Sequence, residues 1–258
     1  MLAILIVGCT LLGLAVGSFL NVVIYRVPRH ESIVSPRSRC PICAAPIKEY
    51  DNIPVVSWLV LRGRCRSCQA PISPRYLVVE LIGGALFGGL AARLGYAWAL
   101  PAYLVFVSSL LALSCIDLEL LVLPKKIIYP TLILVTSLLV IASGALNEWD
   151  RLRVGALCGA AWFVVFFLMN FASPRILGFG DVRLAPLLGL ALGWLGWRYV
   201  VLGFFAANLM GAVIGISLIA AKRLAREQPV PYGVFLSAGA ALALFAGPEI
   251  LSHFQNIR

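Results

Sequence analysis

The chain has 258 residues, of which 61% are hydrophobic and 12% are charged, and its formal net charge is +10. Soluble domains carry about 25% charged residues, so this composition excludes an ordinary soluble domain and indicates a membrane protein. The positive charge could suggest nucleic-acid binding, but the chain has no basic helix with interleaved aromatic residues, which excludes that class too.

Long apolar stretches recur along the chain. A helix needs about 20 apolar residues to cross about 30 Å of hydrocarbon. We therefore predict an all-α polytopic membrane protein with about eight transmembrane helices, at 1–25, 77–93, 97–116, 127–147, 154–173, 182–197, 199–221 and 233–251. The sixth is the weakest, because it is short and contains Pro186, Gly189 and Gly193. The first has no basic leading segment and no small-residue cleavage site, so we expect a retained helix and not a signal peptide.

The positive charges are distributed unevenly over the predicted loops. With the N-terminus outside, most of the 21 lysines and arginines fall on the inner side, and the outer side keeps only Arg93, Arg151, Arg153, Arg198 and Arg258. Such a bias is the positive-inside pattern of a multi-pass protein. Tryptophans at the opposite helix ends fit an aromatic belt, namely Trp98, Trp149, Trp194 and Trp197. Membrane lipid is thus an expected partner, and nucleic acid is not.

Residues 26–76 form a polar insertion with two Cys-x-x-Cys pairs. The predicted division is a first transmembrane helix at 1–25, a zinc-ribbon-like cytoplasmic loop with four cysteines at 26–76, and a membrane core at 77–258. Zn²⁺ takes four thiolates tetrahedrally, and we predict that it binds Cys40, Cys43, Cys65 and Cys68. Because four protein ligands leave no open position, this zinc would be structural and would stabilise a segment with little core. Disulfides, a redox role or an iron–sulfur centre are the alternatives.

Two aspartates, Asp117 and Asp181, adjoin apolar spans at the predicted cytoplasmic side. An ionisable side chain near bilayer depth costs about 2.5–3.5 kcal/mol, so its presence suggests a function. Two carboxyl groups that converge share a proton, and the pair can activate water and protonate a scissile carbonyl. Taken singly, each aspartate could instead cap a helix or pair with a nearby Lys or Arg.

Other catalytic constellations are missing from the sequence. His30 and His253 are the only histidines and lack an HExxH context, and there is no G-x-S-x-G elbow. We expect Glu119 to be solvated, with a supporting role in the site as the alternative, and Glu80 to be ion-paired or hydrogen-bonded near the membrane interface.

An ordered set of motifs runs over nearly the whole chain. It includes GSFLNVVIYR at 17–26, the two cysteine pairs, DNIPVVSWL at 51–59, Asp117 with Leu123-Pro124, GFGD at 178–181 and PYG at 231–233. With these motifs the chain resembles the type IV prepilin peptidases of bacteria, also called prepilin leader peptidase/N-methyltransferases. The family often has Asp after the Leu-Pro, where this chain has Lys125.

The resemblance implies an aspartic endopeptidase of the bacterial plasma (inner) membrane with Asp117 and Asp181 as catalytic dyad. Its implied substrates are prepilins or pseudopilins of type IV pili or type II secretion, cut at the cytoplasmic face after a leader glycine. A second implied activity methylates the new N-terminal amine with S-adenosylmethionine. The residues that would bind this cofactor are unknown, because the sequence has no cofactor-binding glycine loop.

Two other classes of protein are alternatives. A polytopic transporter or assembly factor could use the two aspartates to bind ions or protons, although transport sites lie near the bilayer midplane. The cysteine loop could also be a docking module on a membrane anchor, but eight spans exceed what an anchor needs.

Overall fold

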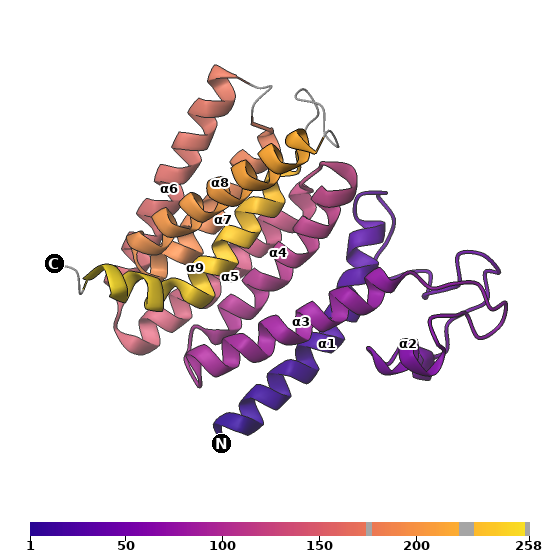
Figure 1. Ribbon diagram of the computed structural model, residues 1–258. Helices are drawn as coiled ribbons and strands as arrows, with labels where there is room; N and C mark the ends of the chain where they lie inside the picture. Colours follow the sequence, from indigo (N-terminus) through magenta and orange to yellow (C-terminus); the bar gives the residue numbers. More distant parts are fainter. Residues whose placement is uncertain (174–176, 222–229, 256–258) are drawn as a thin grey trace. The chain divides into compact units, whose positions relative to one another are not determined.

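The computed structural model describes residues 1–173, 177–221 and 230–255 (Figure 1). Arg175, Lys222, Arg223, Arg226 and Arg258, which count in the predicted charge asymmetry, lie outside the described residues. Eight long helices are present in the described part: α1 (Leu2–Arg26), α3 (Pro74–Leu94), α4 (Leu100–Leu120), α5 (Lys125–Leu146), α6 (Trp149–Ala172), α7 (Phe179–Leu195), α8 (Trp197–Ala220) and α9 (Tyr232–Gln255). The 3₁₀ turn η1 (Glu49–Asn52) and the short helix α2 (Val56–Val60) lie between α1 and α3.

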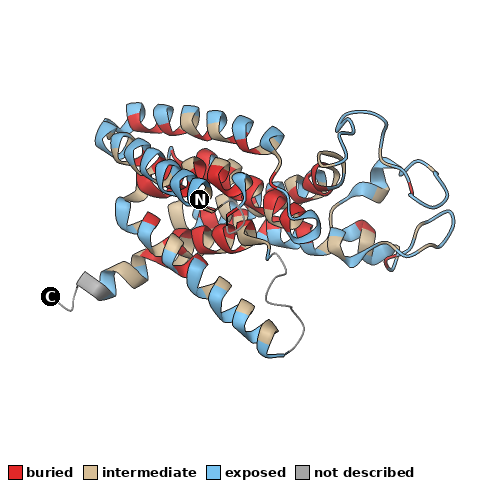
Figure 2. Ribbon diagram, turned by 90° about the horizontal axis from the view of Figure 1, so that it is seen from above, coloured by how far each residue is buried: buried red, intermediate tan, exposed pale blue. Residues whose placement is uncertain are grey.

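The predicted all-α membrane architecture is confirmed. The described residues contain no strand and only two isolated β-bridges, Arg39 with Pro46 and Arg64 with Pro71. Seven of the described helices are long and apolar enough to cross a membrane, and α7, with 17 residues, is the eighth long helix. The segment between α1 and α3 is mostly exposed (Figure 2).

The chain forms two compact units, Met1–Ala97 and Trp98–Arg258. The division into a first helix, a cysteine loop and a core from residue 77 stays a prediction. In the first unit, α1 packs against α3 through glycines: a Cβ added to Gly17 would lie 2.7 Å from the Cα of Glu80. Such small residues let helix backbones approach closely, which is how helices associate in lipid.

In the second unit, α7 is the interior helix. It packs against α5, α6, α8 and α9, and most of its residues are buried. Gly189 and Gly193 face α6, where a Cβ added to Gly189 would lie 2.7 Å from the Cα of Gly159. Tyr103 of α4 also donates a hydrogen bond to the Ala191 carbonyl of α7 at 2.8 Å. Because neighbouring helices surround α7, it does not need the length of a lipid-facing span.

Candidate active site and metal centre

Asp117 lies in the last turn of α4. The sequence ends this span at residue 116, but the helix continues to Leu120 and ends where Leu121 adopts a left-handed conformation, φ 53°. The Leu121 amide donates to the Asp117 carbonyl at 3.0 Å, which closes the helix. The Asp117 side chain is 5% exposed, and within the described residues its Oδ2 has no hydrogen-bond partner.

Asp181 lies in the first turn of α7, after the N-cap residue Gly178. Its amide donates to the Gly178 carbonyl at 3.1 Å, so Asp181 is inside the helix and is not the cap. The residue is 8% exposed, and its Oδ1 has no hydrogen-bond partner within the described residues. The positive end of the α7 dipole is directed toward this position.

The fold brings these two residues together from helices far apart in the sequence. Asp181 interacts electrostatically with Asp117, so the two carboxyl groups share one environment. Leu123, in the turn after α4, packs against both Gly180, next to Asp181, and Gly233, next to Asp117. A Cβ atom added to either glycine would lie 3.0 Å from the Leu123 side chain. A bulkier residue at either glycine would therefore disturb the surroundings of both aspartates.

The first turn of α9 also adjoins the pair, and sequence reasoning gives it no role. The backbone amides of Gly233 and Val234 interact with the Asp117 carboxyl group, and a Cβ added to Gly233 would lie 2.9 Å from Asp117 Oδ2. Tyr232 donates a hydrogen bond to Asn208 Oδ1 of α8 at 3.3 Å and interacts electrostatically with Asp181. The Pro231-Tyr232-Gly233 motif is the feature of the sequence that could have pointed to this turn.

The remaining candidates are more peripheral. Glu119 is exposed in the last turn of α4, and Lys125 is exposed at the first position of α5. His253 lies at the opposite end of α9 from Gly233. Glu80 is buried and accepts a hydrogen bond from the Val55 amide at 2.7 Å, which confirms the expected hydrogen bonding.

The four predicted metal ligands converge in the segment between α1 and α3. The Sγ atoms of Cys40, Cys43, Cys65 and Cys68 all lie within 4.8 Å of one another, and those of Cys40 and Cys68 are 3.8 Å apart. A regular tetrahedron with Zn–S bonds of about 2.3 Å has edges of about 3.8 Å. The cysteines are not bridged by disulfides. The donor set and its spacing therefore fit zinc.

The two cysteine pairs have the same backbone structure. Cys40 and Cys65 each donate from the amide to an alanine carbonyl five residues on, at 2.9 and 2.8 Å. The residue after each second cysteine, Ala44 or Gln69, has a positive φ, 57° or 60°. These turns point backbone N–H groups at sulfur, and the amides of Cys43 and Ile42 lower the pKa of the Cys40 thiol to about 6. A low thiol pKa favours the thiolate that a metal requires.

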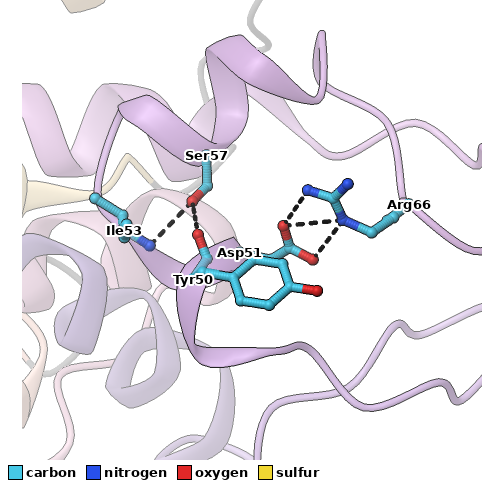
Figure 3. A network of polar contacts seen from close by, with 5 residues as sticks. All are labelled: Tyr50, Asp51, Ile53, Ser57 and Arg66. Atoms are coloured by element: carbon cyan, nitrogen blue, oxygen red, sulfur yellow. Dashed lines mark hydrogen bonds and ion pairs between the residues drawn. The ribbon is translucent and has the colours of Figure 1, made fainter.

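A polar network holds the rest of the insertion (Figure 3). Arg66, between the second pair of cysteines, donates from Nε and Nη2 to both oxygens of Asp51, at 2.6 to 3.1 Å. This guanidinium lowers the pKa of Asp51. Ser57 of α2 donates to the Tyr50 carbonyl at 2.9 Å and accepts from the Ile53 amide at 3.0 Å. The network ties the metal-binding turn to η1 and α2.

Comparison with known families identifies the chain. Residues 11–94 match the Bacterial Peptidase A24 N-terminal domain, and residues 104–216, which hold both aspartates, match the Type IV leader peptidase family. No solved structure matches.

Curated relatives extend the similarity over nearly the full length. A protein of Stutzerimonas stutzeri is 33% identical over 94% of this chain and 91% of its own. Others from Myxococcus xanthus (strain DK1622) and Aeromonas hydrophila are 41% and 35% identical, over 86% and 93% of this chain and 67% and 90% of theirs. All three are named prepilin leader peptidase/N-methyltransferase. The chain therefore belongs to the type IV leader peptidase family, and it is an enzyme of the peptidase class.

Proposed function

We propose that this chain is an aspartic endopeptidase that removes the leader peptide of type IV prepilins or pseudopilins, with Asp117 and Asp181 as its catalytic dyad. The observation that carries the proposal is the convergence of two buried carboxyl groups, each with an oxygen that has no hydrogen-bond partner within the described residues. Buried polar atoms are rarely left unpaired without a reason, and a substrate or water molecule would pair them. The names of the relatives supply the substrate class.

The chemistry follows from two carboxyl groups in one low-dielectric site. Because two neighbouring carboxyl groups in such a site do not both ionise readily, the pair would hold one proton between them. The ionised group takes a proton from water, which attacks the scissile carbonyl, while the protonated group donates to the carbonyl oxygen. As the tetrahedral intermediate collapses, the leaving amine receives a proton from the pair. The pair titrates as a unit, so we assign no fixed acid and base.

The charge distribution supports a cytoplasmic site. With the N-terminus outside, the end of α4 and the start of α7 are both on the side that holds most of the lysines and arginines. The protein would then be a multi-pass protein of the bacterial inner membrane, with the cysteine loop and the dyad in the cytoplasmic half. Cleavage would occur after the leader glycine, before a hydrophobic residue.

Methylation of the new N-terminus is the second part of the proposal, and it rests on the family name of the relatives. S-adenosylmethionine would supply the methyl group. A cavity of about 370 Å³ lies at the far end of α7, beside Trp197, Arg198 and Tyr199. It does not adjoin the aspartates, and we assign no residues to the cofactor. The cluster of four cysteines would hold a structural zinc, because its four thiolates leave no position for substrate.

The test is cleavage of a short-leader prepilin by the full-length protein in membranes, with wild type, Asp117→Asn and Asp181→Asn compared. Asparagine keeps the shape of the side chain but neither ionises nor donates a carboxyl proton, so both variants should be inactive. Glu119→Gln removes an exposed carboxylate two residues from Asp117 and should cleave like wild type.

Mass spectrometry of the product should give a new N-terminus after the leader glycine, heavier by one methyl group when S-adenosylmethionine is present. If either dyad variant cleaves normally, the aspartic mechanism is wrong. If wild type does not cleave, an ion- or proton-binding role for the aspartates takes its place.

A further inference from the structure

The short helix α2 (Val56–Val60) has its polar and apolar faces reversed for a helix in water. Its polar residue, Ser57, is buried and makes hydrogen bonds to the Tyr50 carbonyl and the Ile53 amide. Its apolar residues Val56, Leu59 and Val60 are each more than half exposed. A surface helix of a soluble segment turns its apolar residues inward, so this arrangement suits a nonpolar surrounding.

The residue that precedes α2 is hydrogen-bonded to a residue of α3 that lies beyond the first turn of this membrane-spanning helix. The Val55 amide donates to Glu80 Oε2 at 2.7 Å. Glu80 lies six residues after Pro74, the first residue of α3, which is about 9 Å along the axis at 1.5 Å per residue. Glu80 also packs against Gly17, nine residues before the end of α1, which is about 14 Å from that end. The segment is therefore held beside the two spans and not beyond them.

The attachment at Val55 is strong enough to keep an unfavourable backbone conformation. Val55 has φ 62° and ψ −51°, and the next amide, Val56 N, donates to the Pro54 carbonyl at 2.6 Å, which together define a γ-turn of the rare type. A β-branched residue adopts positive φ only where its surroundings enforce it. Here the Glu80 carboxylate and the two hydrogen bonds of Ser57 provide that constraint, so the place of α2 beside α3 is fixed.

Positive charge follows the apolar face directly. Arg62 and Arg64, just after α2, are both exposed. They flank Gly63, where an added Cβ would lie 2.8 Å from the Trp58 ring, so the tryptophan packs under this turn. Exposed apolar side chains followed by exposed arginines are what an element at the surface of an anionic bilayer requires.

We propose that α2 is an interfacial helix that inserts Val56, Leu59 and Val60 into the leaflet where α1 ends and α3 begins. Arg62 and Arg64 would contact the phosphates of anionic lipid there. The occupant of this apolar face is lipid and not a protein partner. The hydrogen bond from Val55 to Glu80 holds α2 alongside the membrane-spanning helices α1 and α3, so its apolar side chains lie at the level of the bilayer. The cysteine cluster would thus be tethered to the membrane through α2, while its own side chains stay in water. The proposal does not depend on peptidase activity.

The test uses the photoreactive residue p-benzoylphenylalanine in the full-length protein, in vesicles of phosphatidylethanolamine and phosphatidylglycerol. It is introduced at Val60 and, as a matched control, at Ile42, an aliphatic residue between Cys40 and Cys43 with the same exposed fraction, 69%. After illumination, mass spectrometry should find a lipid adduct at Val60 and none at Ile42. A protein adduct at Val60, no adduct there, or equal lipid labelling at both positions would overturn the proposal.

Two further comparisons test the attachment and the charges. Glu80→Leu removes the acceptor of the Val55 amide and should lower the Val60 lipid adduct about tenfold, as expected for loss of a hydrogen bond to a charged group. Glu80→Gln keeps a side-chain oxygen acceptor and should keep the adduct, so equal yields from both variants would overturn the role of Glu80. In vesicles of phosphatidylcholine alone the yield should fall, and an unchanged yield would overturn the role of the arginines.

Discussion

A methyl group at Gly233 tests how the first turn of α9 shapes the aspartate pair. The Cβ of Gly233→Ala would lie 2.9 Å from Asp117 Oδ2, whereas ordinary van der Waals contact begins at 3.4 Å. The carboxyl oxygen must therefore retreat by about 0.5 Å, the difference between these distances. A displacement of about 1 Å at a reacting group can cost about 10²-fold in rate, so half of it should lower kcat about tenfold. Because the added methyl group acts on a proposed reacting carboxyl group, the effect should appear in kcat more than in KM.

The assay is steady-state cleavage of a prepilin in membranes, with thermal unfolding measured on the same samples. Gly215→Ala in α8 is the matched control, because its added methyl meets no atom within 4 Å, and it should behave as wild type. Gly239→Ala, in the same helix as Gly233, would press on the backbone of α8 and should lower stability. The reasoning is refuted if Gly233→Ala keeps full kcat, or if its loss of activity accompanies a loss of stability as large as that of Gly239→Ala. Inactive wild type would instead refute the proposed function.

Two predictions concern the cysteine loop. Chelation of zinc, or Cys43→Ser, should make the cysteine loop sensitive to proteases, while the circular dichroism signal of the membrane helices stays unchanged. Wild-type protein that is purified without bound zinc would contradict this prediction. The Asp51 pKa is lowered by Arg66, so the folded loop binds this proton less readily than the unfolded loop. The resulting stabilisation is complete above about pH 4 and is lost as the pH falls through the lowered pKa. The rates of amide hydrogen exchange in the cysteine loop should therefore differ between wild type and Asp51→Asn at neutral pH and become equal in acid. A difference that persists in acid would contradict the role given to the Asp51–Arg66 ion pair.

The sequence predicts the helices well because hydrophobic length is a strong signal in a membrane. It predicts their ends less well, as Asp117 illustrates. The apolar run stops at Ile116, but a helix ends where the backbone changes conformation, and that occurs at Leu121. The sequence also predicts that the span corresponding to α7 is short, but it does not show that α7 is buried among α5, α6, α8 and α9.

The candidate residues could be picked out from the sequence, but their surroundings could not. Carboxyl groups next to apolar spans are visible in the sequence, as are paired cysteines at ligand spacing. The contact of Leu123 with both Gly180 and Gly233 depends on three segments far apart in the chain, and no local pattern predicts it. The outward apolar face of α2 was hidden for a similar reason, because five residues are too few to give a helical period.

The position of Gly233 at the start of the last helix has a consequence for synthesis. Chain growth runs from the N-terminus, so α4 and α7 are made first, and α6 is already available to pack against α7 as it emerges. The Asp117 carboxyl group lacks the Gly233 and Val234 amides until α9 follows. A nascent chain therefore carries both aspartates in an incomplete setting. If the two aspartates form the proposed dyad, proteolytic competence would arise only when the final helix is inserted.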